Sequence, residues 1–131
     1  MLFAREGVDV AIAHLDEEED AAETKRAVEA EGRRCIVLAG DVADPEFCAA
    51  AVQATLETFG RLDVLVNNAA FQEHVHDITE LSPAHLDRTL KTNLYGYFFM
   101  AQARCPAGGR WGGGRRSVEV LRSPSSRPCR P

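Results

Sequence analysis

The apolar and polar positions of this chain follow two alternating patterns up to about residue 102. Residues 64–66 form a short continuous apolar run, which is typical of a parallel strand covered on both faces. Largely apolar segments also predict strands over residues 8–13 and 35–39, and the strand at residue 64 is expected to extend to Asn67. Longer stretches with helical spacing lie between and after these strands, and their spacing predicts helices over residues 16–31, 45–59 and 83–102. Residues 1–6 are expected to form the last turn of a further helix. This alternation predicts an α/β fold in which helices cover both faces of a parallel sheet.

Residues that begin and end helices support these boundaries. Asp44 and Ser82 each precede a proline, and this pairing suits a helix start because proline has no amide hydrogen to leave unsatisfied. Asp16 and Glu19 have the spacing of a capping box at the start of the first long helix. Glycines tolerate the left-handed backbone found after helix ends, and those expected to end helices are Gly7, Gly32 and Gly60.

Length and composition predict one domain with a reasonable core. The chain has 131 residues, of which 45% are hydrophobic. No apolar run approaches the roughly eighteen residues that would suggest a membrane span, and no signal-like leader is present. The four cysteines lie far apart without paired spacing, which predicts neither a zinc site nor a disulfide framework. We therefore expect a cytoplasmic protein without a membrane partner.

The net charge of -5 combines two very different segments. Residues 105–131 contain six arginines and one acid, together with half of the ten glycines and four of the six prolines. This composition predicts a low-complexity tail that is either disordered or a frameshifted translation, since these residue types have GC-rich codons. A basic tail can also bind nucleic acid, but Trp111 is its only aromatic residue. We therefore expect no nucleic-acid partner.

Residues 61–70 carry the strongest functional signal in the chain. An apolar strand runs directly into two amides, Asn67 and Asn68, and two small residues, Ala69 and Ala70. Ligand-binding residues gather at the carboxyl ends of parallel strands, where the amides offer donors and acceptors. The alanines leave room for a ligand to approach the backbone.

This stretch closely resembles the Asn-Asn-Ala-Gly signature of the short-chain dehydrogenase/reductase family, and the likeness covers residues 1 to about 104. Residues 71–101 further resemble the glucose/ribitol dehydrogenase-like branch. The resemblance implies an incomplete Rossmann-type, doubly wound parallel sheet, with residues 1–104 as a partial NAD(P)-binding domain. It also implies the family's activity, hydride transfer between a nicotinamide and a small alcohol or carbonyl substrate.

The resemblance also implies roles for individual residues. Asp41 and Val42 match the pair that flanks the adenine ring, and Asn93 matches the asparagine of the catalytic tetrad, whose backbone carbonyl holds a water. The alternatives are that Asp41 simply caps a turn and that Asn93 is an ordinary exposed helix residue. We favour the family roles. The residues expected along the ribose and nicotinamide side are Asn68, Ala69 and Ala70, whereas Asn67 is expected to tie neighbouring strands together.

Cofactor choice depends on the end of the second family strand, where His14 stands. An acid there selects NAD through the ribose hydroxyl, and a nearby basic residue accommodates the 2'-phosphate of NADP. His14 satisfies neither rule, and Asp16 is expected to cap a helix. Because imidazole repels a phosphate less than a carboxylate does, the sequence favours NADP over NAD.

His74 and His76 alternate along an extended segment, but no third ligand follows at useful spacing, so we expect no metal site.

Several motifs of the family are missing from this chain. The glycine-rich turn that binds the pyrophosphate belongs near the amino terminus, whereas Gly108, Gly112 and Gly114 match its spacing without following an expected strand. The only lysines are Lys25 and Lys91, and neither lies four residues after a tyrosine. The resemblance therefore implies a chain truncated at both ends, with impaired cofactor binding, no catalytic serine or tyrosine-lysine pair, and no activity by itself.

The missing first strand also affects the expected sheet. In the family order 3-2-1-4-5-6-7 this strand separates the second from the fourth. The strands at residues 8–13 and 64–67 are then expected either to pair directly or to leave two unpaired edges, which favour aggregation.

Three functions remain compatible with the sequence. The first, which we favour, is a fragment of an NAD(P)-dependent oxidoreductase. The second is a non-catalytic subunit that associates with an intact homologue, or with itself, through the helix around residues 94–102. The third is a nucleotide-free interaction module of the flavodoxin type.

Overall fold

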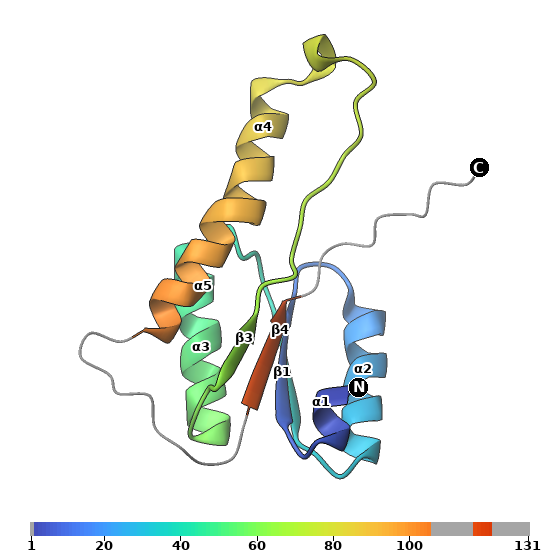
Figure 1. Cartoon of the computed structure of the whole chain (residues 1–131), viewed down its shortest axis with the longest axis vertical. Coiled ribbons are helices and arrows are strands. Elements are labelled where there is room, and N and C mark those ends of the chain that lie inside the picture. The colour runs from blue at the N-terminus through green and yellow to red at the C-terminus, as the bar shows by residue number, and fades with distance from the viewer. Residues whose placement is uncertain (1, 106–116, 122–131) are drawn as a thin grey trace.

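The computed structural model describes residues 2–105 and 117–121. One parallel sheet has the strand order β2-β1-β4-β3. Helices α1 and α2 cover one face of it, and α3 and α5 lie on the other (Figure 1). The predicted α/β fold is therefore confirmed. The described elements are α1 (Leu2–Arg5), β1 (Asp9–His14), α2 (Glu18–Ala30), β2 (Cys35–Ala39), α3 (Pro45–Phe59), β3 (Val64–Val66), the 3-10 turn η1 (Ile78–Glu80), α4 (Pro83–Leu90), the π-helical turn η2 (Lys91–Tyr95), α5 (Gly96–Arg104) and β4 (Ser117–Leu121).

Strand β1 is the most buried strand whose side chains are described, because all six of its residues are buried. Its alternate residues point to opposite faces of the sheet. Val10 and Ile12 join a core cluster that includes Val28 of α2, whereas Ala13 joins a cluster that includes Met100 of α5. Strand β1 is thus packed on both faces, as expected for a central parallel strand.

Two of the predicted helix starts are confirmed atom by atom. The Asp44 carboxylate accepts a hydrogen bond from the Glu46 amide at 2.9 Å, and the Ser82 hydroxyl accepts one from the His85 amide at 3.1 Å. Gly60 ends α3 in the left-handed region, with a φ of 78°. These ends depend on local backbone chemistry, which explains why the sequence locates them.

The predicted capping box at Asp16 and Glu19 is wrong. Helix α2 begins at Glu18, Glu17 takes the N-cap position, and no side-chain hydrogen bond caps the helix. The Glu17 carboxylate instead accepts hydrogen bonds from the amides of Leu15 and Asp16, each at 3.3 Å. The carboxylate therefore satisfies the turn that leaves β1, and the helix starts one residue later than the capping box requires.

The strand between β1 and β3 comes from the carboxyl-terminal segment of the chain. Strand β4 runs parallel to both neighbours, with Ser117 opposite Asp9 and Val118 opposite Val64. The expectation that β1 and β3 pair directly is therefore wrong, and neither edge is left unpaired. Each edge presents a row of backbone N–H and C=O groups, and a short strand inserted between them satisfies both rows. The remainder of the predicted tail, with Gly108, Gly112 and Gly114, lies outside the described residues.

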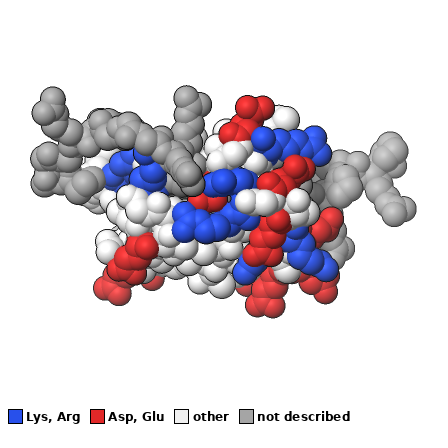
Figure 2. All heavy atoms as spheres, turned by 90° about the horizontal axis from the view of Figure 1, so that it is seen from below, with Lys and Arg blue, Asp and Glu red and all other residues white. Residues whose placement is uncertain are grey.

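Charged side chains gather at the amino ends of the strands, on the face that Figure 2 shows from below. Asp9 is the buried centre of this group, with 8% of its side chain exposed. Its carboxylate accepts a hydrogen bond from Arg33 Nη2 at 2.6 Å and bonds from Arg34 Nη2 and Nε at 2.7 and 3.0 Å. The backbone amide of Arg34 adds a fourth donor at 3.0 Å. These bonds tie the start of β1 to the start of β2.

Candidate functional site

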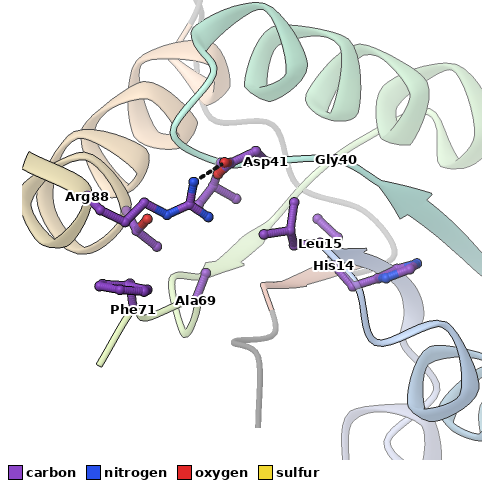
Figure 3. Close-up of a pocket in the computed structure, with 10 residues that line it drawn as sticks. His14, Leu15, Gly40, Asp41, Ala69, Phe71 and Arg88 are labelled. Atoms are coloured by element: carbon purple, nitrogen blue, oxygen red, sulfur yellow. Dashed lines mark hydrogen bonds and ion pairs between the residues drawn. The ribbon is translucent and has the colours of Figure 1, made fainter. Parts of the chain in front are cut away.

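A cavity opens at the carboxyl ends of the strands, beside the helix α4 that carries Arg88 (Figure 3). It contains four of the residues that the sequence singled out, namely His14 from the end of β1, Asp41 and Val42 after β2, and Ala69 after β3. Parallel strands present their carboxyl ends at one edge, where ligands of doubly wound sheets bind. The full lining comprises Ala13, His14, Leu15, Gly40, Asp41, Val42, Ala69, Phe71, Arg88 and Thr92.

Asp41 has both carboxylate oxygens engaged. Oδ1 accepts a hydrogen bond from the Ala43 amide at 2.9 Å, which closes a turn after β2. Oδ2 accepts one from Arg88 Nη1 of α4 at 3.0 Å. Arg88 was not among the predicted site residues, because no local pattern connects it to a carboxylate 47 positions earlier.

His14 is 3% exposed, although it lines the cavity. Its carbonyl accepts a hydrogen bond from the Gly40 amide at 2.8 Å, which joins the ends of β1 and β2. Among the described residues its buried Nδ1 has no hydrogen-bond partner. The ring points away from the Asp41–Arg88 pair in Figure 3. A buried polar atom without a partner is uncommon, and a ligand or water is one of the groups that satisfies it.

Asn93 lies within the π-helical turn η2, which separates α4 from α5. The sequence predicted one uninterrupted helix over residues 83–102, and this prediction is wrong at residues 91–95. The amide of Asn93 accepts a hydrogen bond from the Phe71 N–H at 2.6 Å and donates one to the Phe71 carbonyl at 2.9 Å. These two bonds clamp the segment after β3 onto the helix. These bonds also explain why an asparagine is accommodated inside a helix. Turns with π-helical hydrogen bonding are frequent at functional sites.

The other residues predicted from the sequence do not line the first cavity. Ala70 and Asn93 line a second cavity of about 320 Å³, which lies between α4 and the extended segment after β3. Asn68 is exposed and lines neither of these two cavities. The Asn67 amide nitrogen donates to the Tyr97 carbonyl of α5 at 3.5 Å, so this contact connects a strand end to a helix.

Gly96 allows α5 to approach the loop that carries Asp41 and Val42. A Cβ atom at Gly96 would lie 2.9 Å from Val42 Cγ2 and 3.0 Å from the Val42 carbonyl oxygen. Real Cβ atoms rarely come so close, and the backbone oxygen has little freedom to yield. The first position of α5 therefore needs a residue without a side chain so that Val42 can stay buried against the helix.

Neither a metal centre nor a membrane span is found in the part of the chain that the structure describes. No group of three or more His, Cys, Asp or Glu side chains is placed to hold a metal ion among residues 2–105 and 117–121. Within the same ranges, no helix has the length and apolar character needed to cross a bilayer.

Burial raises the pKa of the Cys35 thiol to about 11, which keeps this thiol protonated at neutral pH.

Comparisons with known proteins agree with this geometry. A family model described as enoyl-(acyl carrier protein) reductase matches residues 1–115. General stress protein 39 of Bacillus subtilis is 47% identical over 100 residues, which is 76% of this chain and 35% of that protein. L-rhamnose 1-dehydrogenase (NAD(P)(+)) of a Sphingomonas species is 38% identical over 117 residues, which is 89% of this chain and 46% of that protein.

A solved structure shows the same likeness in three dimensions. It is a short chain dehydrogenase from Burkholderia cenocepacia in complex with NADP, 36% identical, with a TM-score of 0.77. The match covers 90% of this chain and 46% of that one. This chain therefore spans less than half the length of each of these three relatives. With a family model matched over most of its length and a parallel α/β sheet of the same fold, the chain belongs to the short-chain dehydrogenase/reductase family.

Proposed function

We propose that this chain forms the adenosine-binding part of an NAD(P)-dependent short-chain oxidoreductase. The observation that carries the proposal is the meeting of Asp41, Val42 and Ala69 in one cavity at the carboxyl edge of a parallel sheet. The Asp41 carboxylate supplies acceptors for an exocyclic amine, and Val42 and Ala69 are buried apolar residues suited to a planar base.

The chemistry of the whole protein is proposed from its relatives. When bound, a nicotinamide dinucleotide supplies the carbon that accepts or donates a hydride, and the substrate is an alcohol or a carbonyl compound. We propose NADP as the preferred form because the imidazole of His14, which stands in place of an acid, repels a 2'-phosphate less than a carboxylate would. The Burkholderia relative was solved with NADP. Asn68 and Ala70 are proposed to lie along the ribose and nicotinamide side.

Catalysis by this chain alone is not part of the proposal. Asn93 is the only residue that matches the catalytic tetrad, since neither lysine of the sequence follows a tyrosine at the family spacing. The chain has only the Gly108, Gly112 and Gly114 match to the glycine-rich spacing, and this match follows none of the three predicted strands. We therefore propose impaired dinucleotide binding and no hydride transfer by the isolated chain, with residues 1–104 as the partial binding domain.

Binding of NADP and NAD to the purified chain tests this proposal directly. Isothermal calorimetry is expected to show binding that is tighter for NADP, together with a rise in Tm on adding it. Asp41→Ala is expected to weaken binding about tenfold, which corresponds to one lost hydrogen bond of about 1.4 kcal/mol. Asp87→Ala is the control, because Asp87 lies exposed on α4 and pairs with Lys91 at 2.8 Å.

Each outcome of this experiment decides one part of the proposal. Tighter binding of NAD would overturn the NADP preference, and binding of neither cofactor would overturn the dinucleotide function. Oxidation of a sugar or simple alcohol by the isolated chain, followed as reduced nicotinamide absorbance, would contradict the proposed lack of activity.

An apolar stripe favours a second candidate function, association with another copy of this chain. Large apolar side chains recur every fourth residue along α4, η2 and α5 and remain exposed, up to 60% for Phe98. Such spacing places them along one side of a helix, and contiguous exposed apolar surface marks protein contacts. Helix α4 projects beyond the sheet in Figure 1, and the exposed fractions of these side chains show that they are accessible. We name this set the α4–α5 stripe, and its members are Leu86, Leu90, Leu94 and Phe98.

Leu94→Glu is expected to abolish self-association, because a charge in the middle of the stripe would be buried without a partner. Molar mass measured by light scattering over a range of concentrations should show dimers for the wild type and monomers for the variant. Ala22→Glu is the control, since Ala22 is exposed on α2, which covers the other face of the sheet. A wild-type chain that stays monomeric alone but binds an intact homologue through Leu94 would support the non-catalytic subunit instead.

A further inference from the structure

The Asp41 carboxylate is held from two directions that are far apart in the sequence. Ala43 binds Oδ1 within the turn after β2, and Arg88 binds Oδ2 from helix α4. A carboxylate bound at one oxygen can still rotate about its side-chain torsions, whereas bonds to both oxygens fix its plane. Each oxygen keeps acceptor capacity, because a carboxylate has about four lone-pair sites and only two are used here.

Arg88 is itself held in position. Its guanidinium carbon lies 5.8 Å from the centre of the Phe71 ring, within the range of a cation–π contact. Phe71 is fixed in turn by its two backbone hydrogen bonds to Asn93. Figure 3 shows Arg88 reaching from α4 toward Asp41, with Phe71 below it. The orientation of Asp41 therefore depends on a chain of contacts that begins at the π-helical turn.

We propose, on the basis of the dinucleotide function above, that Arg88 is a positioning residue that aims the Asp41 carboxylate at the base of the cofactor and so selects adenine. Adenine presents an exocyclic amino group, which donates to a carboxylate. Hypoxanthine presents a carbonyl oxygen at the same ring position, and two acceptors repel each other. A fixed carboxylate enforces this difference, whereas one that rotates freely can turn away from the carbonyl.

The test uses calorimetry with the full chain to compare NADP with its hypoxanthine analogue. The two bases differ in this exocyclic group and at the neighbouring N1, which is an acceptor in adenine and an N–H donor in hypoxanthine. The wild type is expected to prefer NADP about tenfold, the discrimination of one hydrogen bond. In Arg88→Met the ratio is expected to fall to about one, mainly because NADP binds less tightly. Arg88→Lys keeps the charge but offers a single point donor, so its ratio should lie between the two.

Lys91→Met is the matched control. It removes another cation from the same helical region, where Lys91 forms an exposed ion pair with Asp87, and it should leave the ratio unchanged. Melting temperatures measured alongside show whether each variant is folded. If Arg88→Met fails to fold, the ratio of Arg88→Lys decides, and a value equal to that of the wild type overturns the inference.

Two results separate this inference from the function on which it depends. If both dinucleotides bind the wild type and Arg88→Met weakens them equally, Arg88 does not aim Asp41, and the dinucleotide function still stands. If neither dinucleotide binds the wild type, the proposed function fails and the inference fails with it.

Discussion

Glu119→Pro is expected to destabilise the sheet, whereas Glu119→Thr is expected to leave its stability nearly unchanged. Residue 119 is the middle of β4, which is hydrogen-bonded to β1 on one side and to β3 on the other. Proline removes the backbone N–H and places its ring against the neighbouring strand, so it is found almost only on edge strands. Threonine keeps the N–H and suits a strand, which makes the pair a test of the backbone alone.

The cost of the proline is expected to be about 2 kcal/mol, because it removes one ladder hydrogen bond and leaves the facing carbonyl without its donor, with a fall in Tm on the order of 10 °C. Hydrogen exchange of the amides in β1 and β3 reports the same event locally, because both strands lose their shared neighbour. In the threonine variant these amides should stay protected. Equal protection and equal Tm in the two variants would show that β4 does not complete the sheet in solution.

Asp9→Asn is expected to destabilise the chain by about 3 kcal/mol at neutral pH. The substitution keeps the size of the side chain but removes the charge that pairs with Arg33 and Arg34 at 2.6 and 2.7 Å. Arg33 is only 23% exposed, so its guanidinium is left partly buried without its anion. Breaking such a pair costs more than an exposed pair contributes, because the remaining charge has lost both its partner and its water.

This loss should depend on pH in a defined direction. Burial by itself raises the pKa of Asp9, but the hydrogen bonds from Arg34 and the charges of Arg33 and Arg34 outweigh it, so the pKa lies below its ordinary value of 3.8. A carboxyl whose pKa is lowered on folding contributes stability above the unfolded value and loses it as the pH falls through the folded value. The difference between wild type and variant should therefore be full at pH 7 and shrink below about pH 4.

Urea denaturation at pH 7 and at a pH below about 4 measures the difference in free energy of unfolding between wild type and variant. Glu31→Gln is the control, because its ion pair with Arg5 at 3.1 Å is exposed and should contribute less than about 1 kcal/mol. Similar losses in the two variants at pH 7, or a difference for Asp9→Asn that grows in acid, would contradict the role given to the buried pair.

The sequence predicted those parts of the fold that depend on neighbours within a few residues. The strand Cys35–Ala39, the helix starts at Asp44 and Ser82, and the helix end at Gly60 follow from apolar runs, capping side chains and glycine backbone freedom. The capping box failed because Glu17 competes for the same turn. The π-helical turn around Asn93 was not predicted, since the bonds to Phe71 that accompany it join residues 22 positions apart.

The candidate site divides in the same way. Residues carried by a motif, such as Ala69 and the Asp41-Val42 pair, do reach the carboxyl edge of the sheet, because a parallel strand delivers whatever follows it to that edge. Arg88 was missed, and Asn68, which the motif includes, lines neither of the two cavities. A motif thus indicates which residues arrive at the edge, but not which of them face the same space.

By itself, the sequence determined the α/β class, three parallel strands, most helix boundaries and the family to which the chain belongs, since each of these depends on local patterns. The tertiary structure alone decided that β4 lies between β1 and β3, that Arg88 meets Asp41, and that Asp9 is buried between two arginines. The physical reason is that such contacts join residues brought together only by packing. Their free energy depends on distance and burial in the folded chain, and no spacing along the sequence records either quantity.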